Sequence, residues 1–286
     1  MQPISFESKF DDIKDRYNEI FVIISPPRCS STAFARVYWE QPSIRYYAHE
    51  PFEGTYFIDG DLDQVLDNLQ HALDLQDIKS YSDGGLGKSL VIKEMPYQVG
   101  DKLPILLSLT KKPVVFLMRD PRQNIASRMA KKQEVGANPL FPHIETGWQL
   151  IAEQVQYCKE NGIPHMIVDA KDFRNQPVPI FKQVFMRLGL PFQEKMLHWN
   201  SRPDIDIDNL DGDHHHLYQE VLSSTGMLPD TDVIPSLESF PAENGYRAHV
   251  KQCMLIYQRL LAAPARIKVP AANARYIALE GSYSSG

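Results

Sequence analysis

The chain has 286 residues, of which 43% are hydrophobic and 23% are charged. These proportions are close to those of an average soluble globular protein, and they exclude collagen-like, coiled-coil and largely disordered chains. With 30 Lys and Arg residues against 36 Asp and Glu residues, the formal net charge is −6, which argues against a surface that binds long polyanionic nucleic acid.

Short apolar runs, most of them rich in β-branched residues, predict buried strands at residues 21–24, 44–48, 90–92, 114–118 and 166–168. Stretches with the apolar spacing of helices alternate with them, at residues 33–39, 62–75, 124–132, 146–161, 180–188 and 246–261. This alternation predicts an α/β fold with three layers, in which helices cover both faces of a central parallel sheet. Ligands of such folds bind beyond the carboxyl ends of the strands, so the residues that directly follow each apolar run are the candidate site.

We expect a single domain over residues 1–286. Residues 201–245 are rich in Asp, Pro and Gly, and we interpret this long connection as a lid over the ligand site. Residues 246–286 contain the last helix and, from residue 262, an extended tail that frays.

The loop after the first strand reads Pro27-Arg28-Cys29-Ser30-Ser31-Thr32 and leads into a helix. Free backbone N–H groups and the helix dipole both favour an anion at such a place. The three hydroxyls and the guanidinium suit phosphate or sulfate oxygens. The alternative is an ordinary Ser/Thr helix cap beside a surface arginine. We expect Cys29 to be a packing residue whose thiol pKa is lowered by this loop.

A loop that binds ATP through the Walker A pattern is absent from this position. Residues 85–89 read Gly-Leu-Gly-Lys-Ser, but Ser82 stands where the pattern requires its first glycine, and the segment precedes a strand when it should follow one. The sequence therefore does not predict a Walker-type nucleotide site.

The loop after the fourth strand offers a second anion site. Arg119 ends the strand, Asp120-Pro121 starts a helix, and Ser127 follows two turns into that helix. An arginine and a serine so placed can hold a second phosphate from two sides. A buried Arg119 paired with Asp120 or Asp169 is an equally good interpretation of the sequence.

Taken together, the two loops resemble those of the family of sulfotransferases that use 3′-phosphoadenosine 5′-phosphosulfate (PAPS). The resemblance covers roughly residues 20–190 and extends to the pattern PRxxSTAFxR…HEPF, found in microbial proteins and a plant group. It implies a fold like that of P-loop nucleoside triphosphatases, without a Walker lysine. Residues 27–32 then hold the 5′-phosphosulfate, with Arg28 where cytosolic members have lysine and Ser30 at a frequent glycine position. Arg119 and Ser127 hold the 3′-phosphate.

Candidates for the catalytic base follow the second and third strands. The second strand runs into His49 and Glu50, and the third into Lys93 and Glu94. Several sulfotransferases use a glutamate at the end of the second strand as the base, so the resemblance favours Glu50, then His49, then Glu94. It also places Lys93 against the transferring sulfuryl group. Solvated or ion-paired residues at strand ends are the alternative.

The resulting prediction is an enzyme that moves the sulfuryl group of PAPS to a hydroxyl or amine of a small molecule, such as a secondary metabolite, by in-line displacement. Residues 201–245 then cover the acceptor site, and Tyr56 and Tyr97 are candidates to line it. A small-metabolite kinase with a P-loop-like fold and a non-catalytic nucleotide-binding module remain alternatives.

Further features bear on cofactors, partners and location. We expect no metal, because the histidines at 214–216 are consecutive in a loop and splay apart. The three cysteines are widely spaced without a CxxC pair, and no segment approaches the roughly 20 apolar residues that span a bilayer. We therefore expect a cytoplasmic protein without a membrane or nucleic-acid partner. A homodimer is one alternative for its oligomeric state.

Overall fold

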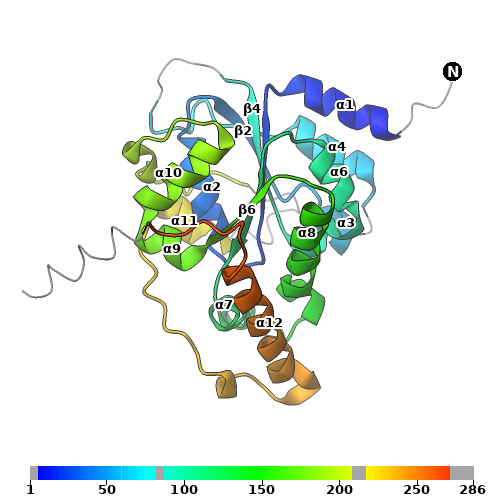
Figure 1. The fold of residues 1–286 in the computed structure, drawn as a ribbon, viewed down its shortest axis with the longest axis vertical. Coiled ribbons are helices and arrows are strands. Elements are labelled where there is room, and N and C mark those ends of the chain that lie inside the picture. The colour runs from blue at the N-terminus through cyan, green and yellow to red at the C-terminus, as the bar shows by residue number, and fades with distance from the viewer. Residues whose placement is uncertain (1–5, 59, 82–86, 208–216, 271–286) are drawn as a thin grey trace, which may run out of the picture.

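The computed structural model describes residues 6–58, 60–81, 87–207 and 217–270. Its centre is a six-stranded sheet with the strand order β3-β2-β4-β1-β5-β6 (Figure 1). Neighbouring strands are parallel, except that β3 runs antiparallel to β2. The strands are β1 (Ile20–Ile24), β2 (Ile44–His49), β3 (Leu73–Asp74), β4 (Ser89–Glu94), β5 (Val114–Met118) and β6 (His165–Asp169). Each predicted strand is present, and the three-layer α/β fold is confirmed.

The strands are apolar along their whole length because both faces of the sheet are covered. Within β1, Ile20, Val22 and Ile24 contribute to one core and Phe21 and Ile23 to the other, as the two-residue period of a strand requires. Helices on the first face are α1 (Phe6–Arg16), α4 (Leu62–Gln70), α6 (Leu103–Ser108), α8 (Trp148–Glu160) and α12 (Tyr246–Leu261). Helices on the second face are α2 (Ser31–Trp39), α9 (Ala170–Asn175) and α10 (Pro177–Leu188).

The helix predicted at residues 62–75 is shorter than expected, because the chain turns into β3 after α4. Leu69 of α4 lies in the core of the first face, whereas Leu75 lies in the core of the second. One helix on a single face of the sheet cannot place both side chains. Leu75 instead donates its backbone N–H to Arg45 at the edge of the sheet, at 2.8 Å.

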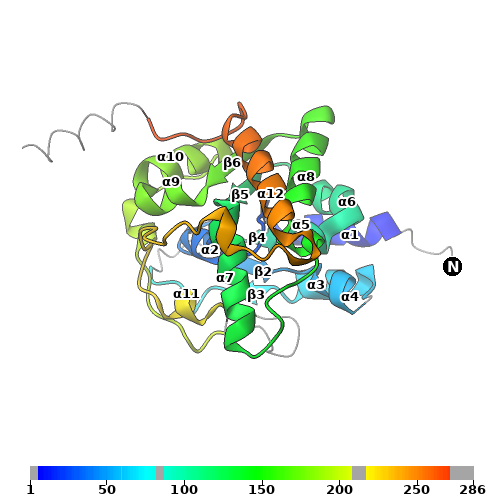
Figure 2. The ribbon, with the colours of Figure 1, turned by 90° about the horizontal axis from the view of Figure 1, so that it is seen from below.

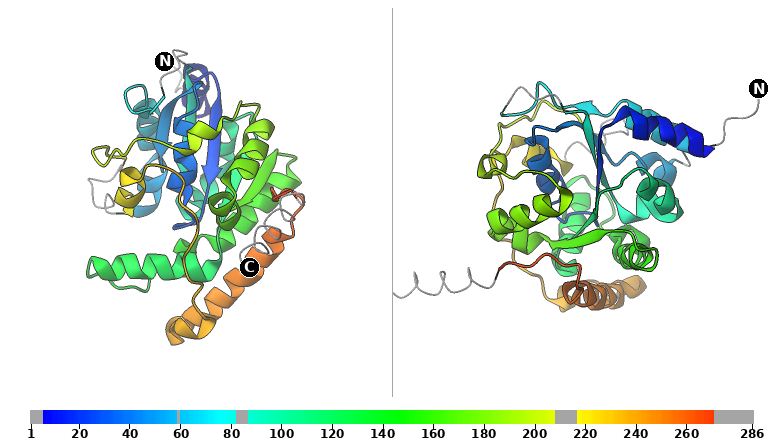
Figure 3. Two further views of the ribbon diagram at one scale, coloured as in Figure 1. Left: turned by 90° about the vertical axis from the view of Figure 1, so that its left-hand side faces the viewer. Right: turned by 45° about the horizontal axis from the view of Figure 1, so that its top comes forward.

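Short helices that the sequence reading did not single out lie around the carboxyl ends of the strands: α3 (Glu53–Phe57), α5 (Pro96–Val99) and α11 (Gln219–Ser223). The long helix α7 (Pro121–Glu134) starts at Asp120, whose carboxylate accepts the backbone N–H of Arg122 at 2.9 Å. Figures 2 and 3 show α7 projecting from the body of the molecule. One side of α7 therefore remains available to line a cavity.

Part of the tail that was expected to fray is anchored beside β6. Ile167 donates its backbone N–H to Ala265, and Ile267 donates its own back to Ile167 at 2.8 Å. The side chain of Ile267 is fully buried. Residues 271–286 lie outside the described part of the chain. Among the described helices, none combines the length and the apolar character needed to cross a bilayer.

Candidate active site

A cavity of about 590 Å³ opens at the carboxyl ends of β1, β2, β4 and β5. Its wall combines the loop after β1, the ends of these strands, one side of α7 and part of the segment 217–232. The predicted site residues that line it are Arg28, Ser30, Ser31, Thr32, Glu50, Lys93, Arg119 and Ser127. The other three, Cys29, His49 and Glu94, are buried behind the wall. The carboxyl ends of the parallel strands thus bring most of the candidate residues to one place, as expected for this kind of fold.

The loop after β1 has an unusual backbone. Arg28 and Ser30 adopt positive φ angles of 61° and 59°, a region that favours glycine. Ser30 precedes α2, but its hydroxyl does not cap the helix; it accepts a long hydrogen bond from Nη1 of Arg174, at 3.4 Å. The structure therefore differs from the ordinary side-chain cap that was the alternative, and the first N–H groups of α2 lie at the cavity wall.

Arg28 reaches across the cavity wall to α7 and to the segment 217–232. Its Nε donates to the hydroxyl of Ser127 at 3.2 Å, and its Nη1 donates to the carbonyl of Leu217 at 3.1 Å. Burial lowers the pKa of Arg28, and the nearby charge of Glu220 partly opposes this effect. Arg28 thus presents a largely desolvated cation, for which an anion is a favourable partner.

The expectation of a lowered thiol pKa at Cys29 is wrong. The residue is fully buried, and burial raises its pKa to about 12. Its Sγ lies 3.9 Å from the carbonyl oxygen of Pro27. Cys29 is a packing residue, as its small apolar side chain suggested.

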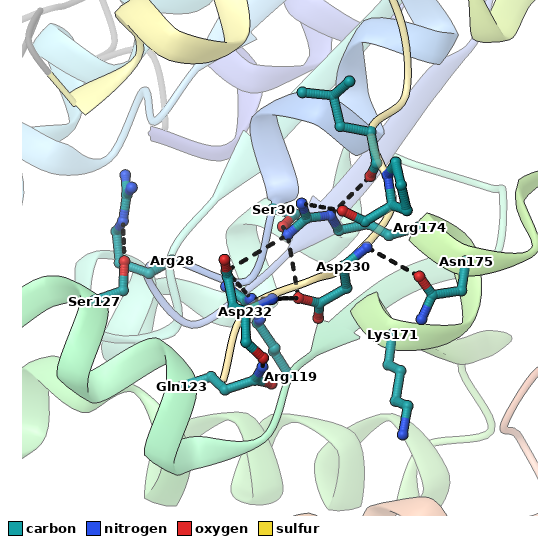
Figure 4. A network of polar contacts seen from close by, with 12 residues as sticks. Arg28, Ser30, Arg119, Gln123, Ser127, Lys171, Arg174, Asn175, Asp230 and Asp232 are labelled. Carbon is teal, nitrogen blue, oxygen red and sulfur yellow. Dashed lines mark hydrogen bonds and ion pairs between the residues drawn. The ribbon is translucent and has the colours of Figure 1, made fainter. Parts of the chain in front are cut away.

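Arg119 contacts two carboxylates from the segment 217–232 (Figure 4). Its Nη2 donates to Oδ1 of Asp230 at 2.8 Å and also to Oδ2 of Asp232. Arg174 of α9 approaches the same two groups, with Nη1 3.6 Å from Asp230 and 3.9 Å from Asp232. Nε of Arg119 is buried and lacks a hydrogen-bond partner among the described residues. This end of the cavity therefore holds two guanidinium groups together with two carboxylates of the same chain.

The partners that the sequence suggested for Arg119 are engaged elsewhere. Asp120 accepts from Nε and Nη2 of Arg122 at 3.0 and 2.7 Å. Asp169 accepts the hydroxyl of Tyr257 at 2.6 Å. The interpretation in which Arg119 pairs with Asp120 or Asp169 is therefore wrong, because both carboxylates serve the helix starts that follow β5 and β6.

At the opposite end of the cavity, Glu50 is held by a buried network. Lys93 donates from Nζ to Oε1 of Glu50, and Gln98 donates from Nε2 to Oε2 at 2.7 Å. Nε2 of His49 lies 3.3 Å from the same Oε1. Burial alone would raise the pKa of Glu50, but the charges and hydrogen bonds of Lys93 and His49 outweigh burial and hold the pKa well below its usual range. Glu50 is therefore ionised.

His49 and Glu94 have roles behind the wall. Nδ1 of His49 lies 2.6 Å from the hydroxyl of Tyr47, and its ring packs edge-on against Tyr218. Glu94 accepts the backbone N–H of Phe52 at 2.7 Å and of Met95 at 2.9 Å, which ties the turn after β2 to the end of β4. Burial and the charge of Glu50 raise its pKa against these bonds. Of the three predicted bases, Glu50 is the one that lines the cavity.

Several cavity residues were missed by sequence reasoning. Arg174 lies on α9, the helix directly after β6, and the strand-end rule applied to this strand would have pointed to it. Tyr218 and Asp232 line the cavity from within residues 201–245, the connection that was predicted to be a lid. Tyr97 lines the cavity as expected, whereas Tyr56 packs behind it with ring centroids 4.9 Å apart.

In the described ranges, no three His, Cys, Asp or Glu side chains are grouped so that they could hold a metal ion. The histidines at 214–216 and Ser82, Gly85 and Leu86 of the Gly-Lys-Ser segment lie outside the described residues. The expectation of a metal-free site stays a prediction.

A family model described as "Sulfotransferase domain" matches residues 20–240, which is most of the chain and contains the whole cavity wall. The chain belongs to the sulfotransferase family. No curated protein sequence matches this sulfotransferase.

Solved structures similar to this sulfotransferase include other sulfotransferases. The sulfotransferase domain from the curacin biosynthetic pathway is 16% identical, with a TM-score of 0.43 over 89% of this chain and 99% of that one. The sulfotransferase domain of the Synechococcus PCC 7002 olefin synthase is 14% identical, with a TM-score of 0.49 over 85% and 96%. Mouse sulfotransferase SULT7A1, solved in complex with PAP, is 10% identical, with a TM-score of 0.41 over 98% and 95%.

Proposed function

We propose that this sulfotransferase moves the sulfuryl group of PAPS to a hydroxyl or amine of a small-molecule acceptor by in-line displacement. The observation that carries the proposal is one cavity with a cationic hydroxyl loop at one side and an ionised, buried glutamate at another. Phosphoryl and sulfuryl transfer need positioning, charge neutralisation and one base, and these groups supply each of them.

The cavity suits a donor that carries two separate anionic groups. Arg28, Ser31 and Thr32 surround the N-terminus of α2, which suits the 5′-phosphosulfate. Arg119 and Arg174 lie at a second position, which suits a 3′-phosphate, and the unpaired Nε of Arg119 offers a donor for it. These cations occur in a chain whose net charge is −6, so they form a local anion site.

PAPS supplies an activated sulfuryl group on a good leaving group, adenosine 3′,5′-bisphosphate. The acceptor atom forms a bond to sulfur while the bond from sulfur to the 5′-phosphate oxygen breaks, and its electron pair remains on that phosphate. Glu50 takes the acceptor proton. Arg28 and the amides of α2 stabilise the charge that develops on the departing phosphate.

The pairing of Glu50 with Lys93 links the two halves of this reaction. Glu50 is a weak base while Lys93 and His49 hold its pKa low. A sulfuryl or phosphate oxygen near Lys93 competes for the ammonium group. As Lys93 turns to that anion, burial dominates at Glu50 and its pKa rises, so that the base gains strength when the donor is present.

Acceptors enter between α3, α5 and α7, beyond Glu50. Phe57, Tyr97 and Val135 supply apolar surface there, with Glu53 and Arg128 among the polar groups. Such a mixed wall suits a small organic acceptor. Residues between 217 and 232, within the predicted lid, line the same cavity, which supports a lid role for this connection.

The test is sulfate transfer from radiolabelled PAPS to a panel of hydroxyl and amine acceptors, together with calorimetry of PAPS and ATP. Transfer with selective binding of PAPS is the expected result. Binding of ATP in preference to PAPS would favour the kinase alternative, and nucleotide binding without transfer would favour a binding module. Arg28→Ala should abolish transfer, whereas Arg28→Lys, which keeps the charge, should retain part of it.

We also propose a cytoplasmic location. The three cysteines, Cys29, Cys158 and Cys253, are all free and buried. Free thiols are typical of reducing compartments. Fractionation of the native host cell with antibodies to the chain tests this location.

A further inference from the structure

The segment 228–232, here called the acidic strap, crosses the cavity beside Arg119 (Figure 4). Arg174 holds its start, donating from Nε to the carbonyl of Leu228 at 3.0 Å and from Nη2 to that of Pro229 at 2.8 Å. Gln123 holds its end through the carbonyl of Asp232, at 2.8 Å. The strap is therefore docked by side chains of α7 and α9.

Both acidic side chains of the strap point at the arginines. The side chain of Asp230 is 4% exposed and that of Arg119 5%, so this pair is buried. Asp232 is 57% exposed and reaches the same Nη2 from the solvent side. A hydrogen bond from Arg119 to Asp232 lowers the pKa of that carboxyl, against the effect of burial. Both carboxylates are matched to guanidinium groups of the cavity wall.

Two carboxylates on two guanidinium groups reproduce the charge and the bonding of one phosphate. A phosphate monoester carries a charge of about −1.5 to −2 at neutral pH and offers three acceptor oxygens. Arginine binds phosphates and carboxylates in the same forked geometry. The arginines that suit a 3′-phosphate are thus already neutralised from within the chain.

We infer that Asp230 and Asp232 are internal ligands of an anion site formed by Arg119 and Arg174, and that the 3′-phosphate of the donor displaces them and releases the acidic strap. The inference rests on the proposed function, because it takes the incoming anion to be the 3′-phosphate of the donor. Beyond that function, it makes the acidic strap a competitor of the nucleotide.

Competition of this kind weakens the binding of every nucleotide that carries a 3′-phosphate, including the product. The measured dissociation constant equals the intrinsic one divided by the fraction of molecules whose strap is released. When the product leaves, the strap carboxylates return to the arginines. The strap thereby lowers the affinity for adenosine 3′,5′-bisphosphate and speeds its release.

The test is calorimetric binding of adenosine 3′,5′-bisphosphate and of 5′-AMP to the full chain and to the Asp230→Asn/Asp232→Asn variant. The bisphosphate should bind the variant about tenfold or more tightly, as expected for removal of a competing internal ligand. Affinity for 5′-AMP should change by less than about twofold, because AMP lacks the group that competes. Asp204→Asn is the matched control, since Asp204 pairs with Arg202 at 3.0 Å and does not line the cavity.

Hydrogen exchange of the unmodified chain provides a second readout that does not depend on a variant. Saturating bisphosphate should speed exchange at the backbone N–H groups of Asp230 and Asp232, which Asn175 and Asp230 accept in the docked strap, and saturating 5′-AMP should not. The inference would be overturned if the bisphosphate bound the variant no more tightly and left exchange in the strap unchanged, or if it protected the strap. The proposed function would still stand. Failure of the bisphosphate to bind either form would overturn both.

Discussion

The two ends of the cavity neutralise their buried cations in different ways. At one end Lys93 pairs with Glu50. The two residues lie at the carboxyl ends of the adjacent parallel strands β4 and β2, and the backbone N–H of Glu50 donates to the carbonyl of Lys93 at 2.7 Å. At the other end Arg119 pairs with Asp230 and Asp232, which lie 111 and 113 residues further along the chain. The sheet fixes the first pair, whereas the second depends on a segment that side chains alone dock. The first is suited to chemistry and the second to exchange with a ligand.

Of the replacements at the two ends, that of Glu50 has the largest expected effect on turnover. Glu50→Gln should lower kcat about 10²- to 10⁴-fold, because a positioned base is lost. Bisphosphate affinity should not fall, because the arginines of the anion site are unaltered and Lys93 is released from Glu50. Steady-state kinetics, calorimetry and a melting curve measure these effects. Glu94→Gln is the control at the next strand end, and a larger loss of kcat there would move the base to Glu94.

Replacing Arg119 breaks the exchangeable end. Arg119→Ala should weaken the binding of adenosine 3′,5′-bisphosphate about 10- to 100-fold, which corresponds to the loss of charge-assisted hydrogen bonds. Binding of 5′-AMP should weaken by less than about threefold, and the kcat at saturating donor should fall much less than in Glu50→Gln. Equal losses for the two nucleotides in calorimetry would contradict the assignment of Arg119 to the 3′-phosphate.

Replacing Ser30 tests the loop between the two ends. Ser30→Gly should raise the free energy of unfolding by about 0.5–1 kcal/mol, because glycine accepts the φ of 59° without strain and loses only a 3.4 Å contact to Arg174. Ser30→Ala keeps the strain and loses the same contact, so it should be no more stable than the unmodified chain. Denaturant unfolding of the three forms measures the order, and a glycine form less stable than the alanine form would refute this account.

A histidine away from the cavity separates pH effects on stability from those on the two ends. Burial, and then the charge of His143, lower the pKa of His249 to about 4 from the ordinary 6.5. The unfolded chain thus binds a proton more readily, and stability should fall as pH drops from about 7 towards 4. The expected loss by pH 5 is on the order of 1 kcal/mol after allowing for partial exposure.

His249→Gln should flatten this pH dependence in denaturant titrations. Between pH 7 and 5 the carboxylates of Glu50 and Asp232 stay charged, because the pKa values of both are lowered. An equal fall in the variant would assign the effect to another histidine.

Much of the fold was predictable because its signals are local. The apolar runs gave β1, β2, β4, β5 and β6 within a few residues, and the last helix has the expected bounds, Tyr246–Leu261. The two-residue strand β3 was missed, because it is too short to show a period and exists only through its pairing with β2. Leu73 in this strand and Leu75 after it fit a helical pattern, but both side chains pack in the core of the second face.

The candidate site was predictable as far as strand ends define it. Arg28, Glu50, Lys93 and Arg119 line the cavity, because parallel strands deliver their following residues to one edge. The pairing of Arg119 with Asp230 could not be read from the sequence, since it depends on where a long connection docks. Each remaining error, including the thiol of Cys29, concerned burial or a partner far along the chain.

The way in which the sheet ends at its two outer strands has a consequence for handling the protein. An exposed strand edge carries unpaired N–H and C=O groups that recruit other chains and lead to aggregation. Here β3 is only two residues long, and residues 265–267 pair with the free side of β6. A shortened form that ends before Ala265 would expose β6 to neighbouring molecules. Truncations made for crystallisation should therefore keep residues 265–267.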